Sequence, residues 1–286
     1  MKYFKKQPRT NFVYAGVIAA GLLGSFYYSH LEEVPITQRR RFVAISKEKE
    51  LEYGLKTYKA ILDSYHDHIL PSYHPLSQQV QSVVTQLTQL PELKGQNWKV
   101  HVINSNIPNA FVVAGGHIFV FTGILPIANT SDKLSAVLSH EIAHVVARHH
   151  AEGQSLQVGL AVLASAINFF INPPEFLTNM IIQLGLDLPH SRMRESEADE
   201  IGLYLMSKAC FDPHGATQYW QSMLDHRVSA IDPSKQKGMS DFWSTHPADQ
   251  ARIDNIRLWM DKAEQIGMDA GCHHVSLFRS HMTRFS

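Results

Sequence analysis

The sequence lacks an excess of either charge, because 26 Lys and Arg residues balance 26 Asp and Glu residues. Such a chain has no global field that attracts nucleic acid, and it shows no basic stripe interleaved with aromatic residues. It also lacks internal repeats and low-complexity tracts, while 44% hydrophobic residues over 286 positions suffice for a packed core. The composition therefore argues against a nucleic-acid partner and favours one large folded domain or two small ones.

Charged residues are absent from residues 12–31, directly after a basic tail at residues 1–10 that has no acidic side chain. Twenty helical residues at about 1.5 Å each match the hydrocarbon thickness of a bilayer, and tyrosines lie near both ends of the run. A cleaved signal peptide is the alternative, but the run is long for that purpose and no Ala-x-Ala-like site follows it. We therefore expect one transmembrane helix over residues 11–31.

Three small residues, Gly16, Ala20 and Gly24, recur every four positions in this span, a spacing that lets two helices approach closely. A homo-oligomer is therefore among the expected assemblies. The arginines at residues 39–41 nearly match the basic count of the N-terminal tail, so the positive-inside rule leaves the orientation open. Residues 32–45 are expected to form a linker that leads out of the membrane.

The remaining residues, 46–286, are expected to fold as one mainly helical α+β domain with a small sheet. Apolar residues three and four apart predict helices, and alternation predicts strands in "NWKVHVINS" and on either side of Gly115 and Gly116. The two apolar segments between residues 156 and 186 are too short to span a bilayer comfortably, so we expect buried or membrane-surface helices rather than a re-entrant hairpin. The expected helices are Ser46–Leu70, His74–Leu90, Leu134–His150, Leu156–Ile171, Phe176–Leu186, Ser191–Ala209, Pro213–Arg227 and Ala248–Ile266.

The stretch "HEIAH" at residues 140–144 has the spacing of a metal site. His140 and His144 are four apart on a helix, so both imidazoles project from one face and can chelate one ion, with Glu141 about 100° round the helix. The three fixed positions arise by chance in roughly one such chain in twenty, so the motif needs context. Apolar residues at helical spacing supply the context of a buried zinc-binding helix, namely Leu134, Val137, Leu138, Ile142, Val145 and Val146.

Two residues compete to be the third ligand. His150 has the metzincin spacing of ten positions after His140, but that class turns the chain at a glycine where Ala147 stands. Because Ala147 and Arg148 are good helix formers, the helix should continue. His149 and His150 would then lie about 9 Å along the axis from the motif, as ordinary cations at a helix C-terminus.

The second candidate lies in "SRMRESEADEIG", where Glu195 and Asp199 are four apart on one helix face. One of them can ligate a metal while the other accepts a hydrogen bond from the far nitrogen of a ligating histidine. Glu197 lies two positions from each and is expected to face elsewhere. A solvated acidic patch paired with nearby arginines is the alternative, but the histidine pair favours Glu195 as the ligand.

In its two motifs, "HEIAH" and, about fifty residues later, "SRMRESEADEIG", the sequence resembles the gluzincin family of HtpX-type heat-shock peptidases and CAAX prenyl endopeptidases. "NAFVVAGGHIFVFTGIL" is similar to the family's strand pair beside the cleft, and "STHPADQARI" to its His-Pro motif. The resemblance runs from about Arg39 to Met260 and implies a zincin-like fold, one zinc ion, Glu195 as third ligand and Asp199 behind a ligand. The single N-terminal span is most similar to mitochondrial inner-membrane stress endopeptidases whose activity overlaps that of the m-AAA protease, although these usually have Gly where Gln38 stands.

That similarity implies a single-pass protein of the mitochondrial inner membrane, with its catalytic domain towards the intermembrane space. It implies stress-activated quality control, with membrane proteins, including a dynamin-like fusion GTPase, as substrates and the lipid bilayer as a partner. A bacterial inner-membrane protein that faces the periplasm is the alternative location.

Two imidazoles and one carboxylate leave a ligand position for water, which is typical of a catalytic zinc site. Zinc lowers the pKa of that water to about 7, and Glu141 can then act as the general base in attack on a peptide carbonyl. His246, before Pro247, is expected to be a transition-state donor or a reversible fourth ligand, with an ordinary helix-start histidine as the alternative. A zinc-stabilised holdase that does not cleave is the competing function, but a structural site has no need of Glu141.

Two further features are expected, a strand that binds substrate and a disulfide. Residues Asn109, Ala110 and Phe111 are expected to bind an extended substrate as an added strand, although Phe111 fits an ordinary core position equally well. Cys210 and Cys272 are the only cysteines, and we expect them to form a disulfide rather than two inert core thiols.

Overall fold

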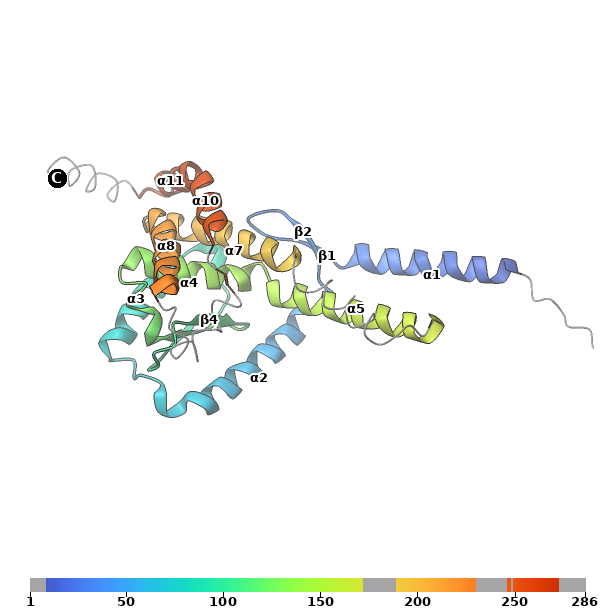
Figure 1. Cartoon of the computed structure of the whole chain (residues 1–286), viewed down its shortest axis with the longest axis horizontal. Helices are drawn as coiled ribbons and strands as arrows, with labels where there is room; N and C mark the ends of the chain where they lie inside the picture. The colour runs from blue at the N-terminus through green and yellow to red at the C-terminus, as the bar shows by residue number, and fades with distance from the viewer. Residues whose placement is uncertain (1–8, 172–188, 230–245, 248, 273–286) are drawn as a thin grey trace, which may run out of the picture.

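The computed structural model describes residues 9–171, 189–229, 246–247 and 249–272. A mainly helical body surrounds a small sheet, and helix α1 (Arg9–Ser29) projects away from that body (Figure 1). The expected mainly helical α+β fold is thereby confirmed. No helix within these described ranges is long and apolar enough to cross a membrane, so the transmembrane role expected for α1 stays a prediction.

Three strands form the central sheet in the order β3-β5-β4 (Lys99–Ile103, His117–Phe121 and Ala110–Val113). Strands β4 and β5 are antiparallel, and the turn between them uses Gly115 and Gly116 at φ values of +98° and +86°, which glycine adopts without strain. Strand β3 runs parallel to β5. The strand pair expected around the two glycines is therefore confirmed, and β4 lies at an edge of the sheet.

Helices cover both faces of this sheet. Along β5, Ile118 and Val120 belong to the main core, whereas Phe119 and Phe121 point to the other face and pack beneath α2, as the period of a strand requires. The helices of the body are α2 (Lys47–Tyr65), α3 (Pro75–Thr88), α4 (Ser131–Val146), α5 (His149–Ile171), α7 (Pro189–Lys208), α8 (His214–Ser229), α10 (Gln250–Leu258) and α11 (Met260–Asp269), with short 3₁₀ turns η1 (His66–His68), η2 (Pro91–Leu93) and η3 (Thr122–Ile124).

Side-chain caps set the starts of several helices. Ser46 accepts a hydrogen bond from the backbone N–H of Lys49 at the start of α2. Thr130 accepts one from the N–H of Lys133 at the start of α4. These bonds satisfy N–H groups that have no partner within the helix.

Helix α4 is the central element of the body. It contacts α3, α7, α8 and strand β4, and its residues Leu134 to Val145 are buried without interruption. Helix α7 approaches α4 closely at Gly202, where an added β-carbon would lie 3.0 Å from the backbone nitrogen of His140. The "HEIAH" motif therefore lies on a buried helix, as its apolar context predicted.

The segment expected to be a plain linker has structure of its own. Strands β1 (Leu31–Glu33) and β2 (Arg40–Phe42) pair as an antiparallel hairpin, and Val34 and Arg41 are buried against the body. In the turn between the strands, Gln38 has a φ of +57°, a left-handed conformation that favours glycine. This conformation accounts for the glycine that similar enzymes usually have at that position.

The expected helix Leu134–His150 is confirmed as far as Val146, but it is wrong in running without a break to His150. Helix α4 ends at Val146, Arg148 has a φ of +50°, and a new helix begins at His149. Good helix propensity at Arg148 is overridden because its buried guanidinium forms ion pairs, at 2.6 Å each, with Glu32 of the hairpin and Glu50 of α2. The direction of the chain after α4 is therefore set by tertiary contacts.

Two other expected segments also differ. The expected helix over residues 248–266 is divided at Trp259 into α10 and α11. The expected helix at residues 156–171 is the later part of α5, which extends from the same side of the body as α1 (Figure 1). The segment at residues 176–186 lies outside the described residues.

Candidate metal centre

Four side chains from three parts of the chain converge beside α4. His140 and His144 come from α4, Glu195 from α7 and His246 from the segment before α10, and one potential ligand atom of each lies within 4.8 Å of the others. His150, the rival third ligand, is exposed and is not a member of this group among the described residues. The structure therefore brings together the residues that the two separated motifs predicted.

The spacing of these atoms fits a tetrahedral ion. The Nε2 atoms of His140 and His144 are 3.2 Å apart, and the carboxylate of Glu195 lies 3.4 Å from each of them. Ligands at bond lengths of about 2.0–2.1 Å on a tetrahedral zinc ion lie roughly 3.3 Å from one another. Two imidazole nitrogens and one carboxylate are also a donor set that zinc accepts. The residues present therefore fit the metal that the motif implies.

Asp199 and Arg252 support His140 from behind. The Nδ1 atom of His140 lies 3.0 Å from a carboxylate oxygen of Asp199, as expected for a residue that fixes the orientation of a ligand. Arg252 donates two hydrogen bonds to the same carboxylate, at 2.5 and 2.7 Å, and lies 3.4 Å above the ring of Trp220. Arg252 was missed by the sequence analysis, although it lies within the "STHPADQARI" motif six positions after His246.

Charges within the site shift the acidity of its members. Burial lowers the pKa of His140, but hydrogen bonds to Asp199 and Glu195 outweigh this and raise it to about 9. Burial lowers the pKa of His144 well below its usual range. Burial also opposes ionisation of Glu195, yet its hydrogen bonds to His140 and His246 hold its pKa far below the usual range. Because a ligating histidine must lose its proton, metal binding competes with protonation of His140.

Glu141 is buried next to the converging group. Among the described residues, none forms a hydrogen bond with its Oε1 atom, although the side chain is only 3% exposed. Burial raises the pKa of this carboxyl above its ordinary value, which brings it closer to the pH range in which a general base works best. A buried carboxylate oxygen that accepts no hydrogen bond from the described residues, with Nε2 of His246 at 3.6 Å, is able to accept a proton beside the converging group.

His246 lies at the fourth corner of the group. Its Nδ1 atom is 2.8 Å from Glu195 and 3.3 Å from Nε2 of His140, while its Nε2 atom lies 3.6 Å from Glu141. The alternative of an ordinary helix-start histidine is not favoured, because Asp249 caps α10 instead.

His149 and Glu197 have a different environment from the one expected. His149 is 3% exposed and lies against His144, so the expectation of an ordinary helix-terminal cation is wrong for this residue. Glu197 does face away from the metal-type group, but it is buried and contacts His149. The expectation for His149 depended on an uninterrupted helix, and the turn at Arg148 changes the direction in which His149 points.

The expected substrate strand lies on β4. Ala110 and Val112 face the core, while Phe111 is half-buried and stacks on Phe119 of the neighbouring strand. Strand β4 contacts α4, and its second edge carries no strand among the described residues. An edge strand beside the metal-type group offers the backbone hydrogen bonds by which an extended peptide can add to a sheet.

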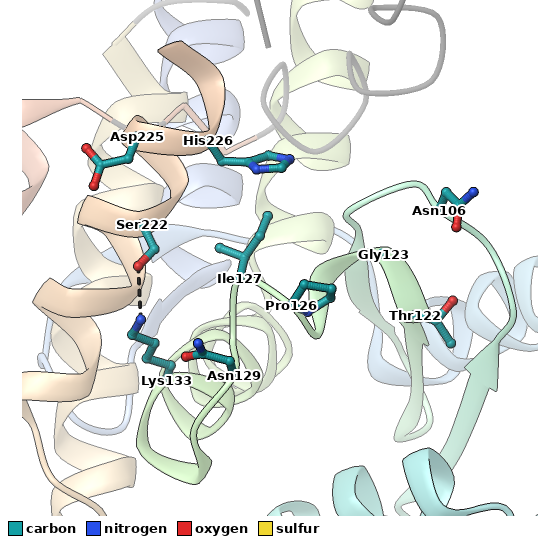
Figure 2. A pocket seen from close by; sticks show the side chains of 10 residues that line it. All are labelled: Asn106, Thr122, Gly123, Pro126, Ile127, Asn129, Lys133, Ser222, Asp225 and His226. Carbon is teal, nitrogen blue, oxygen red and sulfur yellow. Dashed lines mark hydrogen bonds between the residues drawn. The ribbon is translucent and has the colours of Figure 1, made fainter. Parts of the chain in front are cut away.

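A separate pocket of about 650 Å³ lies between the loop before β4, the loop after β5 and the end of α8 (Figure 2). Lys133 and Ser222 meet at its wall through a hydrogen bond of 3.0 Å (Figure 2). None of the four converging side chains lines this pocket.

Cys210 and Cys272 form a disulfide with their Cα atoms 5.3 Å apart. The bond joins the turn that follows α7 to the turn that follows α11, and it lies at the far end of α7 from Glu195. It therefore restrains the helix that carries the carboxylate of the converging group.

Comparison with known proteins agrees with this geometry. The profile of peptidase family M48 matches residues 75–260, which include every residue of the converging group. The chain is 38% identical to mitochondrial metalloendopeptidase OMA1 of Schizosaccharomyces pombe, over 96% of this chain and 80% of that protein. It is 35% identical to the OMA1 of Saccharomyces cerevisiae, over 86% and 74% of the two chains, and 31% identical to the human one, over 92% and 52%. Since the profile covers about two-thirds of the sequence and encloses the residues that meet beside α4, this chain belongs to peptidase family M48 and is a metalloendopeptidase.

Proposed function

We propose that this metalloendopeptidase holds one zinc ion between His140, His144 and Glu195 and cleaves membrane proteins of the mitochondrial inner membrane. The observation that carries the proposal is the convergence of these three side chains at 3.2–3.4 Å, beside a buried oxygen of Glu141 that accepts no hydrogen bond from the described residues. A zinc ion bound there would polarise the scissile carbonyl and lower the pKa of a water to about 7.

The protein's own residues supply the remaining steps. Glu141 removes the proton from the attacking water and returns it to the leaving amine, so no covalent intermediate is needed. Strand β4, with Asn109, Ala110 and Phe111, aligns the substrate backbone and thereby its carbonyl. Asp199 keeps His140 in the tautomer that ligates through Nε2.

Of the two roles expected for His246, its position supports that of a reversible fourth ligand. Its Nδ1 atom lies within 3.3 Å of both Glu195 and His140, so it fills the corner that a substrate carbonyl and water must share. Departure of this imidazole would then open the site to substrate.

The names of relatives and the surface of α1 support the proposed location and substrates. Relatives of this chain are named as mitochondrial, and aliphatic side chains of α1 are exposed, with Leu22 and Leu23 at 68% and 69%. A helix with this surface would be stabilised by lipid, which places membrane proteins within reach of the domain. The fusion GTPase implied by the resemblance stays a prediction within this proposal, as does the orientation towards the intermembrane space.

Exchange of the general base tests the mechanism. The variant Glu141→Gln should keep its fold and its zinc but lose cleavage of an unfolded membrane substrate by several orders of magnitude, because only the proton acceptor is removed. The matched control is Glu200→Gln, which loses only a partly exposed ion pair with Lys262. Undiminished proteolysis by Glu141→Gln would reject the assigned role.

Zinc content tests the ligand set. Glu195→Ala should release zinc, whereas His150→Ala should retain it, since His150 is exposed outside the converging group. The opposite pattern would favour a metzincin-like site. A zinc-stabilised holdase is not favoured, because a purely structural site makes no use of a buried Glu141 whose Oε1 atom accepts no hydrogen bond from the described residues.

A further inference from the structure

Three side chains, those of His144, His149 and Glu197, form a line of hydrogen bonds that leads away from the converging group. The Nδ1 atom of His144 lies 2.8 Å from Nδ1 of His149, and Nε2 of His149 lies 2.9 Å from a carboxylate oxygen of Glu197. All three side chains are buried. The mechanism proposed above makes no use of His149 or Glu197.

Proton positions along this chain are fixed once His144 ligates through Nε2. A neutral ligating histidine must carry its proton on Nδ1, so His144 donates to Nδ1 of His149. His149 must then carry its own proton on Nε2, and it donates that proton to the carboxylate of Glu197. Each hydrogen bond therefore determines the tautomer required by the next.

The two histidine ligands are thus supported in different ways. His140 reaches a carboxylate directly, because its Nδ1 atom lies 3.0 Å from Asp199. His144 reaches a carboxylate only through His149. Outer partners of this kind orient the ring of a ligating histidine and raise its basicity.

Glu197 is held in turn by the hairpin that follows α1. Arg39 donates hydrogen bonds to Glu197 at 2.7 and 2.9 Å, and Thr37 donates one to its other oxygen. Arg39 also forks onto Glu152 of α5 at 2.7 and 2.8 Å. The segment between β1 and β2 therefore contacts the same carboxylate that orients His149.

We propose that His149 and Glu197 are positioning residues that couple the hairpin at residues 31–42 to the metal ligand His144. The inference rests on the proposed zinc site and adds that the hairpin is part of what sets the geometry of that site. Loss of the contact between Arg39 and Glu197 weakens the orientation of His144 without any change to a ligand. Detachment of the hairpin from the body therefore loosens the metal centre.

The test measures zinc affinity by chelator competition and the visible absorption spectrum of the cobalt-substituted protein, both on the full chain. We expect His149→Phe and Glu197→Gln to weaken zinc binding about 10- to 100-fold and to alter the cobalt bands, which report ligand geometry. Arg39→Met should change both in the same direction by a smaller factor. The matched control is Arg40→Met, since Arg40 is the next residue and its ion pair with Glu33 is exposed.

The outcomes separate this inference from the proposed function. If the wild-type chain binds zinc no better than Glu195→Ala, the proposed site itself fails. If the wild type binds zinc through Glu195 but Glu197→Gln and Arg39→Met match Arg40→Met in affinity and spectrum, the coupling is refuted and the site stands. Glu197→Gln and Arg39→Met test the coupling even if His149→Phe does not fold.

Discussion

The close approach of α7 to α4 at Gly202 gives a sharp test of what holds the metal ligands together. A β-carbon at Gly202 would lie 3.0 and 3.1 Å from the backbone N and Cα of His140 and 3.2 Å from the carbonyl carbon of Ser139. Ordinary contact begins at 3.4 Å, and these neighbours are backbone atoms of a buried helix that cannot rotate away. The change Gly202→Ala must therefore push α7 from α4 by a few tenths of an ångström.

The size of the effect follows from two opposing terms. Overpacking costs about 1–3 kcal/mol, while replacing a helical glycine by alanine returns about 1 kcal/mol. We expect a net loss of about 1 kcal/mol in the free energy of unfolding, measured by urea denaturation with a chelator present. Glu195 lies two helical turns before Gly202 on α7. The shift of α7 therefore also increases the distance between Glu195 and the two histidines, by more than the roughly 0.2 Å that zinc sites tolerate. Zinc affinity should fall about tenfold or more.

The matched control is Gly159→Ala on α5, where an added β-carbon meets no atom of the described residues within 4 Å. This control should gain up to about 1 kcal/mol and leave zinc affinity unchanged. If Gly202→Ala gains stability as the control does and binds zinc equally well, the close packing of α4 and α7 does not set the distance between Glu195 and the two histidines.

Three further predictions concern stability. Replacement of Cys210 and Cys272 by serine opens a crosslink across 62 positions, which should lower the free energy of unfolding by up to about 4 kcal/mol in denaturant titrations. Burial opposes ionisation of Glu197, but hydrogen bonds from its partners hold its pKa at about 2 against an ordinary 4.5. The ionised carboxylate therefore contributes at most about 3 kcal/mol to the free energy of unfolding. This contribution is complete above pH 4.5 and is lost as the pH falls through 2. Acid unfolding of Glu197→Gln should accordingly depend less on pH in that window, and an unchanged slope would contradict the shift. Arg252→Met leaves Asp199 buried without its cation, so thermal unfolding with a chelator present should show a loss of about 3–5 kcal/mol, and a neutral result would exclude a strong pair.

The converging group could be predicted from the sequence because its signals are local. His140 and His144 share a helix face by their spacing, and the fixed separation of Glu195 and Asp199 identifies a second helix face with two carboxylates. Apolar residues around the first motif correctly predicted its burial. What periodicity alone did not provide was the meeting of the two helices, which came from the family resemblance.

Other features depend on contacts between distant residues and left no local signal. The hairpin at residues 31–42 read as a linker, because three-residue strands give no alternating pattern long enough to recognise. The end of α4 was missed because Arg148 is a good helix former whose conformation depends on Glu32 and Glu50, about a hundred residues earlier. Arg252 was missed because a buried arginine looks like any surface charge until Asp199 and Trp220 are placed beside it.

The left-handed turn at Arg148 makes the end of helix α4 depend on contacts with another part of the chain. A glycine at that position would bend the backbone by itself, whatever surrounded it. An arginine bends there only while two acids from the N-terminal third hold its side chain, so a chain without them would tend to run on as straight helix and carry His149 away from His144. The positions of His144 and His149 relative to each other therefore depend on acidic residues from the start of the chain.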